Sequence, residues 1–141
     1  MPVPLRHRAV AGAGLAAALL LKPLPLRVQL AALRVVVALP AASRRRVEAL
    51  HTAVEAVRPV WWPGRLACLE TQIATVVACA LTGRRVHLVF GARLLPCEAH
   101  AWLRTPQGDV ALGEDAVDRP WTPALIVPAM PDAGPAETAP R

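Results

Sequence analysis

The spacing of apolar residues predicts helices in the first half of the chain and strands in the second. Over residues 26–37, leucine and valine recur every three or four positions, as on one face of a helix, and Pro40 ends the pattern. Another helix is expected after Ser43, a good N-cap. Its buried stripe consists of Val47, Leu50, Val54 and Val57.

The segment from Cys68 to Leu81 is apolar on nearly every side, which predicts a helix buried at the centre of its domain. A turn at Trp61-Trp62-Pro63-Gly64 precedes it, and Gly83 caps its end. Short apolar runs of the β type follow, two of them joined in an antiparallel hairpin by Pro106-Gln107-Gly108. The expected strands are Val86 to Ala92, Ala99 to Arg104, Asp109 to Leu112 and Ala124 to Val127.

Helices followed by a small antiparallel sheet are the order of an α+β protein. A chain of 141 residues suits one hydrophobic core. We therefore expect one domain, made of an N-terminal helical segment over residues 1–42, a core over 43–130 in which the Cys68 helix packs on the sheet, and a loose tail over 131–141.

The N-terminal apolar run over residues 9–21 follows Arg6 and Arg8, as in a signal peptide. The run is too short to span a bilayer, and no cleavage site of the small-x-small type follows it. We expect a packed helix here, with peripheral contact to a membrane as the alternative.

Composition adds a basic surface, since the formal net charge is +6 and arginine carries nearly all of it. Such a surface is either merely solvated or in contact with an acidic partner, and nucleic acid is not expected because no basic stretch is interleaved with aromatic residues. Three cysteines without a C-x-x-C pair predict free thiols in a reducing compartment, and hence a cytoplasmic protein.

Cys68 has the surroundings of a reactive thiol. It lies at the start of the central helix, where unpaired N–H groups and the helix dipole stabilise a thiolate. His100 begins a strand that can cross this helix terminus, so its imidazole is a candidate base. Taken singly, a core cysteine and a structural histidine are the simpler interpretation.

A third group, on the strand paired with that of His100, is expected to orient the imidazole. If Thr105 faces Asp109 across the turn, then His100 faces Glu114. A register shifted by one residue places Asp115 there instead.

The other two cysteines show fewer signs of a reactive thiol. Cys79 is expected in the core, and Cys97 lies in a loop near His100, where it is a second candidate thiol. The spacing of the cysteines, His87 and His100 matches no zinc site, so we expect neither a metal nor an organic cofactor.

The residues around Cys68 and His100 also resemble those of one family. They are Trp61-Trp62-Pro63-Gly64-Arg65-Leu66-Ala67-Cys68-Leu69-Glu70, then Gly83-Arg84-Arg85-Val86, Gly91 and His100-Ala101-Trp102-Leu103. This pattern is similar to that of the stand-alone leader peptidases of lasso-peptide biosynthesis, which are transglutaminase-like cysteine proteases, over roughly residues 47–128. The Trp-Trp-Pro-Gly approach to Cys-Leu is fairly specific, whereas many transglutaminase-like proteins contain His-Ala-Trp.

The resemblance implies a transglutaminase-like or papain-like core and a cysteine peptidase that removes the leader from a lasso-peptide precursor, which frees the core peptide for macrolactam formation. It implies Cys68 as nucleophile, His100 as base and Glu114 as orienting acid, with Asp115 left open. The implied partners are the precursor peptide, a leader-recognition protein and the macrolactam-forming cyclase. At position 72 this chain has glutamine where the family often has serine. We expect this difference to affect how the substrate fits more than the chemistry. A non-catalytic scaffold or a membrane-associated protein of the same complex is the alternative.

Overall fold

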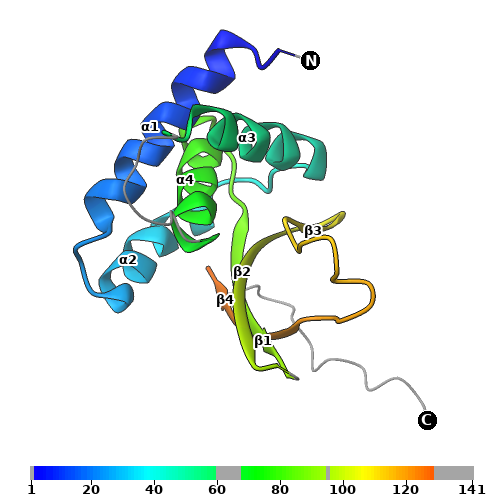
Figure 1. The fold of residues 1–141 in the computed structure, drawn as a ribbon. Coiled ribbons are helices and arrows are strands. Elements are labelled where there is room, and N and C mark those ends of the chain that lie inside the picture. Colours follow the sequence, from blue (N-terminus) through cyan, green and yellow to red (C-terminus); the bar gives the residue numbers. More distant parts are fainter. Residues whose placement is uncertain (1, 60–67, 95, 129–141) are drawn as a thin grey trace.

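The computed structural model describes residues 2–59, 68–94 and 96–128. In this part of the chain, helices precede one four-stranded antiparallel sheet, which confirms the α+β prediction (Figure 1). The helices are α1 (Leu5–Leu21), α2 (Leu26–Leu33), the 3-10 helix η1 (Arg34–Ala38), α3 (Arg44–Val57) and α4 (Cys68–Leu81). The strands are β1 (His87–Arg93), β2 (Glu98–Thr105), β3 (Gly108–Val110) and β4 (Thr122–Val127).

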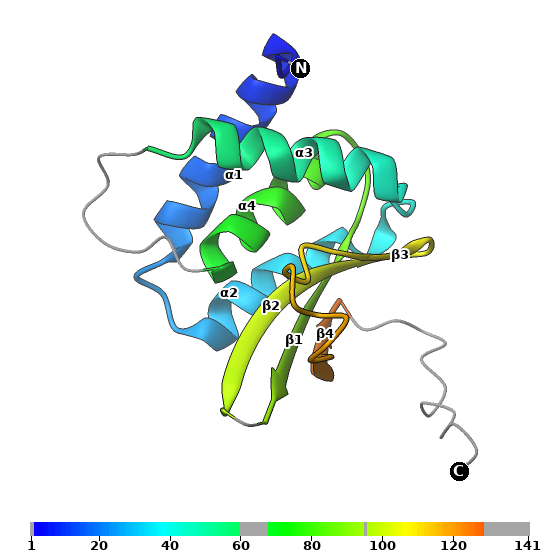
Figure 2. The ribbon, with the colours of Figure 1, turned by 45° about the vertical axis from the view of Figure 1, so that its right-hand side comes forward.

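Helix α4 lies at the centre of the molecule. It packs against α1 and α3 on one side and against β2 and β1 on the other (Figure 2). Residues 71–76 of α4 are all buried, as are Ala78 and Cys79. The central buried helix predicted from the sequence is therefore confirmed, with the bounds expected for it.

The apolar run of α1 is part of the same hydrophobic core. Ala11 and Ala18 are buried in it, together with residues of α3, α4 and the sheet. At Gly14 the two backbones come so close that a Cβ atom would collide with the carbonyl oxygen of Ala74 in α4. A packed N-terminal helix is thus what residues 9–21 form. No helix in the described ranges is long and apolar enough to cross a membrane.

The ends of α3 and α4 follow their local sequence signals. Ser43 caps α3, since its hydroxyl accepts a hydrogen bond of 3.3 Å from the N–H of Arg46. Gly83 ends α4 with a φ of 76°, and the next N–H, that of Arg84, donates to the carbonyl of Cys79 at 3.0 Å. The turn expected at residues 61–64 and the tail over 131–141 lie outside the described residues.

The helix expected over residues 26–37 is divided in two. Helix α2 ends at Leu33, and the chain continues as the 3-10 helix η1. Residues 35–37 are three successive valines, whose branched side chains crowd the preceding turn of an α-helix and disfavour its continuation. The apolar stripe survives the change, because Leu30, Leu33 and Val36 are buried.

The sheet has the strand order β3-β2-β1-β4, with antiparallel pairing throughout. Strands β1 and β2 pair over their length, with Gly91 opposite His100. A Cβ atom on Gly91 would run into the indole of Trp102, so glycine is required for this part of the sheet to pack.

The register expected for the His100 hairpin is wrong by one residue. Thr105 pairs with Gly108 and not with Asp109. Gly108 adopts a φ of 130° and joins the ladder, and its carbonyl accepts a hydrogen bond of 2.8 Å from the hydroxyl of Thr105. The turn is therefore one residue shorter than expected, and β3 ends at Val110, before the ladder reaches His100.

Replacing Gly14 by alanine is expected to lower the free energy of unfolding by about 1–3 kcal/mol, because the added Cβ forces α1 away from α4. The control is Gly12→Ala, since a Cβ at Gly12 meets no atom within 4 Å. Alanine favours helix, so this variant should be as stable as the wild type or up to about 1 kcal/mol more stable. Urea unfolding measures both, and equal effects would contradict the close approach of the two helices.

His87 is a structural residue of β1. Its buried ring places Nδ1 2.7 Å from the carbonyl oxygen of Pro128 and, because a carbonyl only accepts, Nδ1 carries the proton. Burial lowers the pKa of His87, although the hydrogen bond to Pro128 acts in the opposite direction. Burial also lowers the pKa of His51, against the attraction of Glu55.

The free energy of unfolding is expected to fall as the pH is lowered from 7.5 to 5.5. In the unfolded chain these histidines have a pKa near ~6.5 and take up protons that the folded protein does not. Their contribution to stability is thus complete above that pKa and is lost as the pH falls toward the folded-state value. Urea unfolding at several pH values measures the trend. His87→Asn, whose amide N–H can still donate to Pro128, should flatten it, and an unchanged slope would contradict this role.

Candidate active site

His100 is held by a hydrogen bond and by two aromatic rings. Its Nε2 lies 2.9 Å from the main-chain carbonyl oxygen of Ala111. Its ring stacks on Trp121, with centroids 5.0 Å apart, and on Trp102 at 6.2 Å. Because a carbonyl oxygen only accepts, Nε2 carries the proton of the neutral ring. Nδ1 therefore keeps the lone pair that a base requires.

The position of the Ala111 carbonyl results from a sharp turn after β3. Ala111 has a φ of 65°, in the left-handed region that residues with a Cβ atom seldom adopt, and Gly113 follows with a φ of 94°. The left-handed conformation costs an alanine about 1–2 kcal/mol. Strain of this kind persists where the surrounding structure enforces it, often at functional sites.

An ion-pair network anchors the segment that covers His100. Arg93 of β1 donates to Glu98 and to Asp115, at 2.6 Å each, and its guanidinium lies 4.0 Å from the ring centroid of Trp121. Arg119 lies 3.9 Å from Asp115. The hydrogen bond from Arg93 lowers the pKa of Asp115, which is therefore ionised as part of this anchor.

The two candidate acids do not lie as the expected register placed them. Glu114 is exposed, and its carboxylate has no ion pair among the residues that the structure describes. Asp115 is engaged by Arg93 and Arg119. The hydrogen-bond acceptor for Nε2 of His100 is therefore the main-chain carbonyl of Ala111, and not either of these carboxylates.

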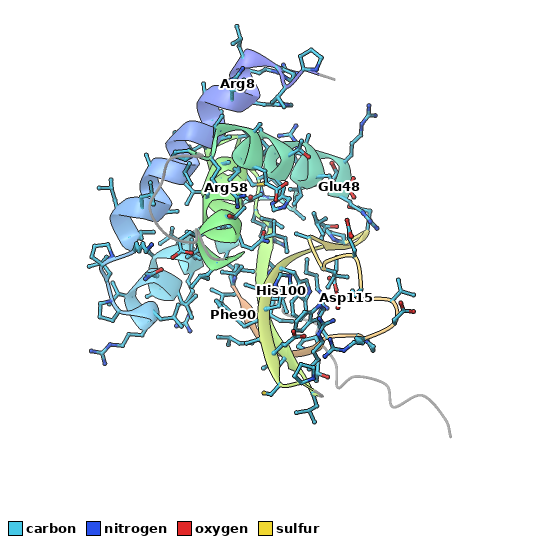
Figure 3. All side chains as sticks on the ribbon, viewed as in Figure 1. Arg8, Glu48, Arg58, Phe90, His100 and Asp115 are labelled. Atoms are coloured by element: carbon cyan, nitrogen blue, oxygen red, sulfur yellow. The ribbon has the colours of Figure 1, made fainter. Side chains whose placement is uncertain are left out.

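A cavity of about 370 Å³ joins His100 to the helices. Figure 3 shows Arg58 among the helices and His100 below it on β2. The cavity opens at the surface, since Glu55, Arg58 and Gly113 are exposed. Its lining consists of His51 and Glu55 from α3, Arg58 directly after that helix, Thr71 and Gln72 from α4, and His100, Ala111 and Gly113.

Cys68 is the first residue of α4, as expected, and its side chain lies outside the described residues. Positions three and four apart share one face of an α-helix. Position 68 is thus one turn before Thr71 and Gln72, on the face of α4 that lines the cavity.

Cys79 and Cys97 occupy very different surroundings. Cys79 is fully buried, as expected, and burial raises the pKa of its thiol to about 12, so it stays protonated and unreactive. Cys97 is exposed in the turn between β1 and β2. Among the described residues no three His, Cys, Asp or Glu side chains come together as metal ligands.

A second cavity, of about 600 Å³, lies between α1 and the start of α3. Arg6, His7, Arg45 and Arg46 line it, and none of the lining residues in the described part of the chain is acidic. This cavity gathers part of the positive charge that the composition indicates.

Three parts of the site were missed by the sequence analysis. The carbonyl of Ala111 has no side-chain signature, and alanine argues against the left-handed turn that positions it. Trp121 and Arg93 act on His100 and its covering segment through contacts between distant parts of the chain. No local pattern reveals such contacts.

A helix that begins with cysteine, packed on an antiparallel sheet that presents a histidine, defines the class of papain-like and transglutaminase-like folds. A family model described as "Transglutaminase-like superfamily" matches residues 11–125. The chain therefore belongs to the transglutaminase-like superfamily, which indicates an activity of the cysteine-protease or acyl-transfer type. No curated protein and no solved structure matches the chain.

Proposed function

We propose that this protein is a cysteine peptidase that removes the leader from a ribosomally synthesised lasso-peptide precursor. The observation that carries the proposal is that His100, with the lone pair on Nδ1, lines one cavity with the first turns of α4. Superfamily membership supports the reaction class. The resemblance around Cys68 and His100 supports the substrate class.

In the proposed reaction Nδ1 of His100 takes the proton of the Cys68 thiol, and the thiolate attacks the carbonyl carbon of the last leader residue. N–H groups at the start of α4 stabilise the oxyanion. The imidazolium then protonates the departing amine, which becomes the free amino terminus of the core peptide. Water, deprotonated by His100, cleaves the thioester and releases the leader as an acid. The carbonyl of Ala111 keeps the ring oriented throughout.

We further propose that a leader-recognition protein delivers the precursor and that a cyclase receives the core peptide. The basic cavity between α1 and α3 suits an acidic stretch of the leader. Exposed apolar side chains at the end of α1 and along α2 and η1 suit a protein partner, and peripheral membrane contact is the alternative use of this surface. The exposed apolar side chains of this surface are Leu20, Leu24, Leu26, Val28, Val35 and Val37.

Cys68→Ala and His100→Ala are each expected to reduce leader removal at least about a thousandfold, because either change abolishes the nucleophile or its base. Mass spectrometry of a precursor incubated with the protein and its recognition protein measures cleavage. The control is Cys97→Ala, at the exposed thiol, which should cleave as the wild type does. If Cys68→Ala still cleaves the precursor at one bond, the protein is a scaffold and not the peptidase. The same conclusion follows if the wild type leaves the precursor intact under conditions where a mixture that contains the cyclase still yields product.

We propose Glu114 as the acid that balances the charge of the His100 imidazolium. Because the Ala111 carbonyl already orients the ring, Glu114→Gln should lower kcat less than about tenfold, far below the ~10⁴-fold loss seen when a directly bonded carboxylate is removed. Asp115→Asn is the comparison, and it should lower the melting temperature because it breaks the ion pair with Arg93. A loss beyond a thousandfold in a folded Glu114→Gln variant would mean that this carboxylate orients His100 directly.

A further inference from the structure

Gln72 carries a buried acceptor without a partner. The residue is 3% exposed, and its Oε1 has no hydrogen bond. The nearby hydroxyl of Thr75, by contrast, is paired: it donates to the carbonyl of Thr71 at 2.9 Å and lies 3.4 Å from Nδ1 of His51. A buried acceptor left unpaired destabilises the folded state, so its presence calls for a specific reason.

The location of Gln72 supplies such a reason. Four residues in the described ranges have buried polar atoms without partners, and of these only Gln72 lines the His100 cavity. Side chains of an α-helix lean toward its N-terminus, so the carboxamide lies over the turn that begins at position 68. Any group that binds Gln72 therefore lies beside His100 and the start of α4.

The size and charge of the cavity favour a segment of peptide as the occupant. A water molecule takes about 30 Å³ in the liquid, so a cavity of about 370 Å³ is far larger than one bridging water requires. The two described lining residues of permanent charge, Glu55 and Arg58, have opposite signs and are exposed at the mouth, and Glu55 lies 3.6 Å from Nε2 of His51. Of the lining residues that the structure describes, the buried group that lacks a partner is the neutral carboxamide of Gln72, which both accepts and donates, as a peptide group does.

We propose that Gln72 binds the main chain of the precursor beside the bond that is cut, its carboxamide turning toward the cavity so that Oε1 accepts a hydrogen bond from one peptide N–H. The inference rests on the proposed peptidase function and adds a substrate-binding residue to it. The hydrogen bond holds the precursor before and during the reaction alike, so its loss should appear in KM.

The first test replaces Gln72 by methionine, which keeps the length of the side chain and removes the amide. We expect kcat/KM for the precursor to fall about tenfold through KM, with kcat within about twofold and a melting temperature equal to or above that of the wild type. The matched control is Gln29→Met, at a buried glutamine of α2 whose Nε2 donates to the carbonyl of Leu24. This control should lower the melting temperature and leave KM unchanged.

The second test identifies the donor on the precursor. In a series of precursors, one peptide N–H near the cleaved bond is replaced in turn by an ester oxygen. One ester should lower kcat/KM about tenfold with the wild type and have no further effect with Gln72→Met, as expected for two halves of one contact. If only a side-chain substitution in the precursor shows this pattern, the main-chain assignment is overturned.

The outcomes separate this inference from the peptidase proposal. A wild-type protein that leaves every precursor intact would refute the peptidase itself. Cleavage by the wild type with the same KM for Gln72→Met would refute the role of Gln72 alone.

Discussion

Helix α4 must be covered on every side, and this requirement sets the place of the other elements. Its sequence is apolar on nearly every side, so α1 and α3 pack against one side and the sheet against the other. The contact with α1 is close enough to require glycine at position 14. Because the start of the same helix borders the His100 cavity, the packing that stabilises the domain also fixes one half of the candidate site.

The other half of the site depends on the segment after β3. The left-handed turn at Ala111 directs a carbonyl to Nε2 of His100, and the network around Arg93 anchors the covering segment through Asp115 and Trp121. A main-chain carbonyl fixes the tautomer as a carboxylate would, but it adds no full negative charge. The contact at Ala111 therefore orients the ring, and the proposed mechanism needs a different group to stabilise the imidazolium.

The sequence predicted the features that local signals determine. The bounds of α4, the cap at Ser43 and the left-handed Gly83 each follow from a few adjacent residues, and all are found. The hairpin register depended on whether Gly108 lies in the turn or in the ladder, and its pairing with Thr105 decides this. That pairing is set in the folded sheet and not by adjacent residues alone. So are the turn at Ala111 and the ion pairs of Arg93, which join residues distant in the chain.

Two features of the His100 cavity cost the folded protein stability. Ala111 is in a strained conformation and Gln72 has an unpaired acceptor. Three more buried atoms without partners in the described residues belong to Glu70, in the first turn of α4, to Trp102, which stacks on His100, and to Arg85, which lies just before β1. By contrast, the buried side chains of Gln29 and Thr75 are hydrogen-bonded to main-chain carbonyls. Proteins retain local conflicts of this kind where function requires them, so the strain at Ala111 and the unpaired acceptor of Gln72, two residues that line the cavity, support the site.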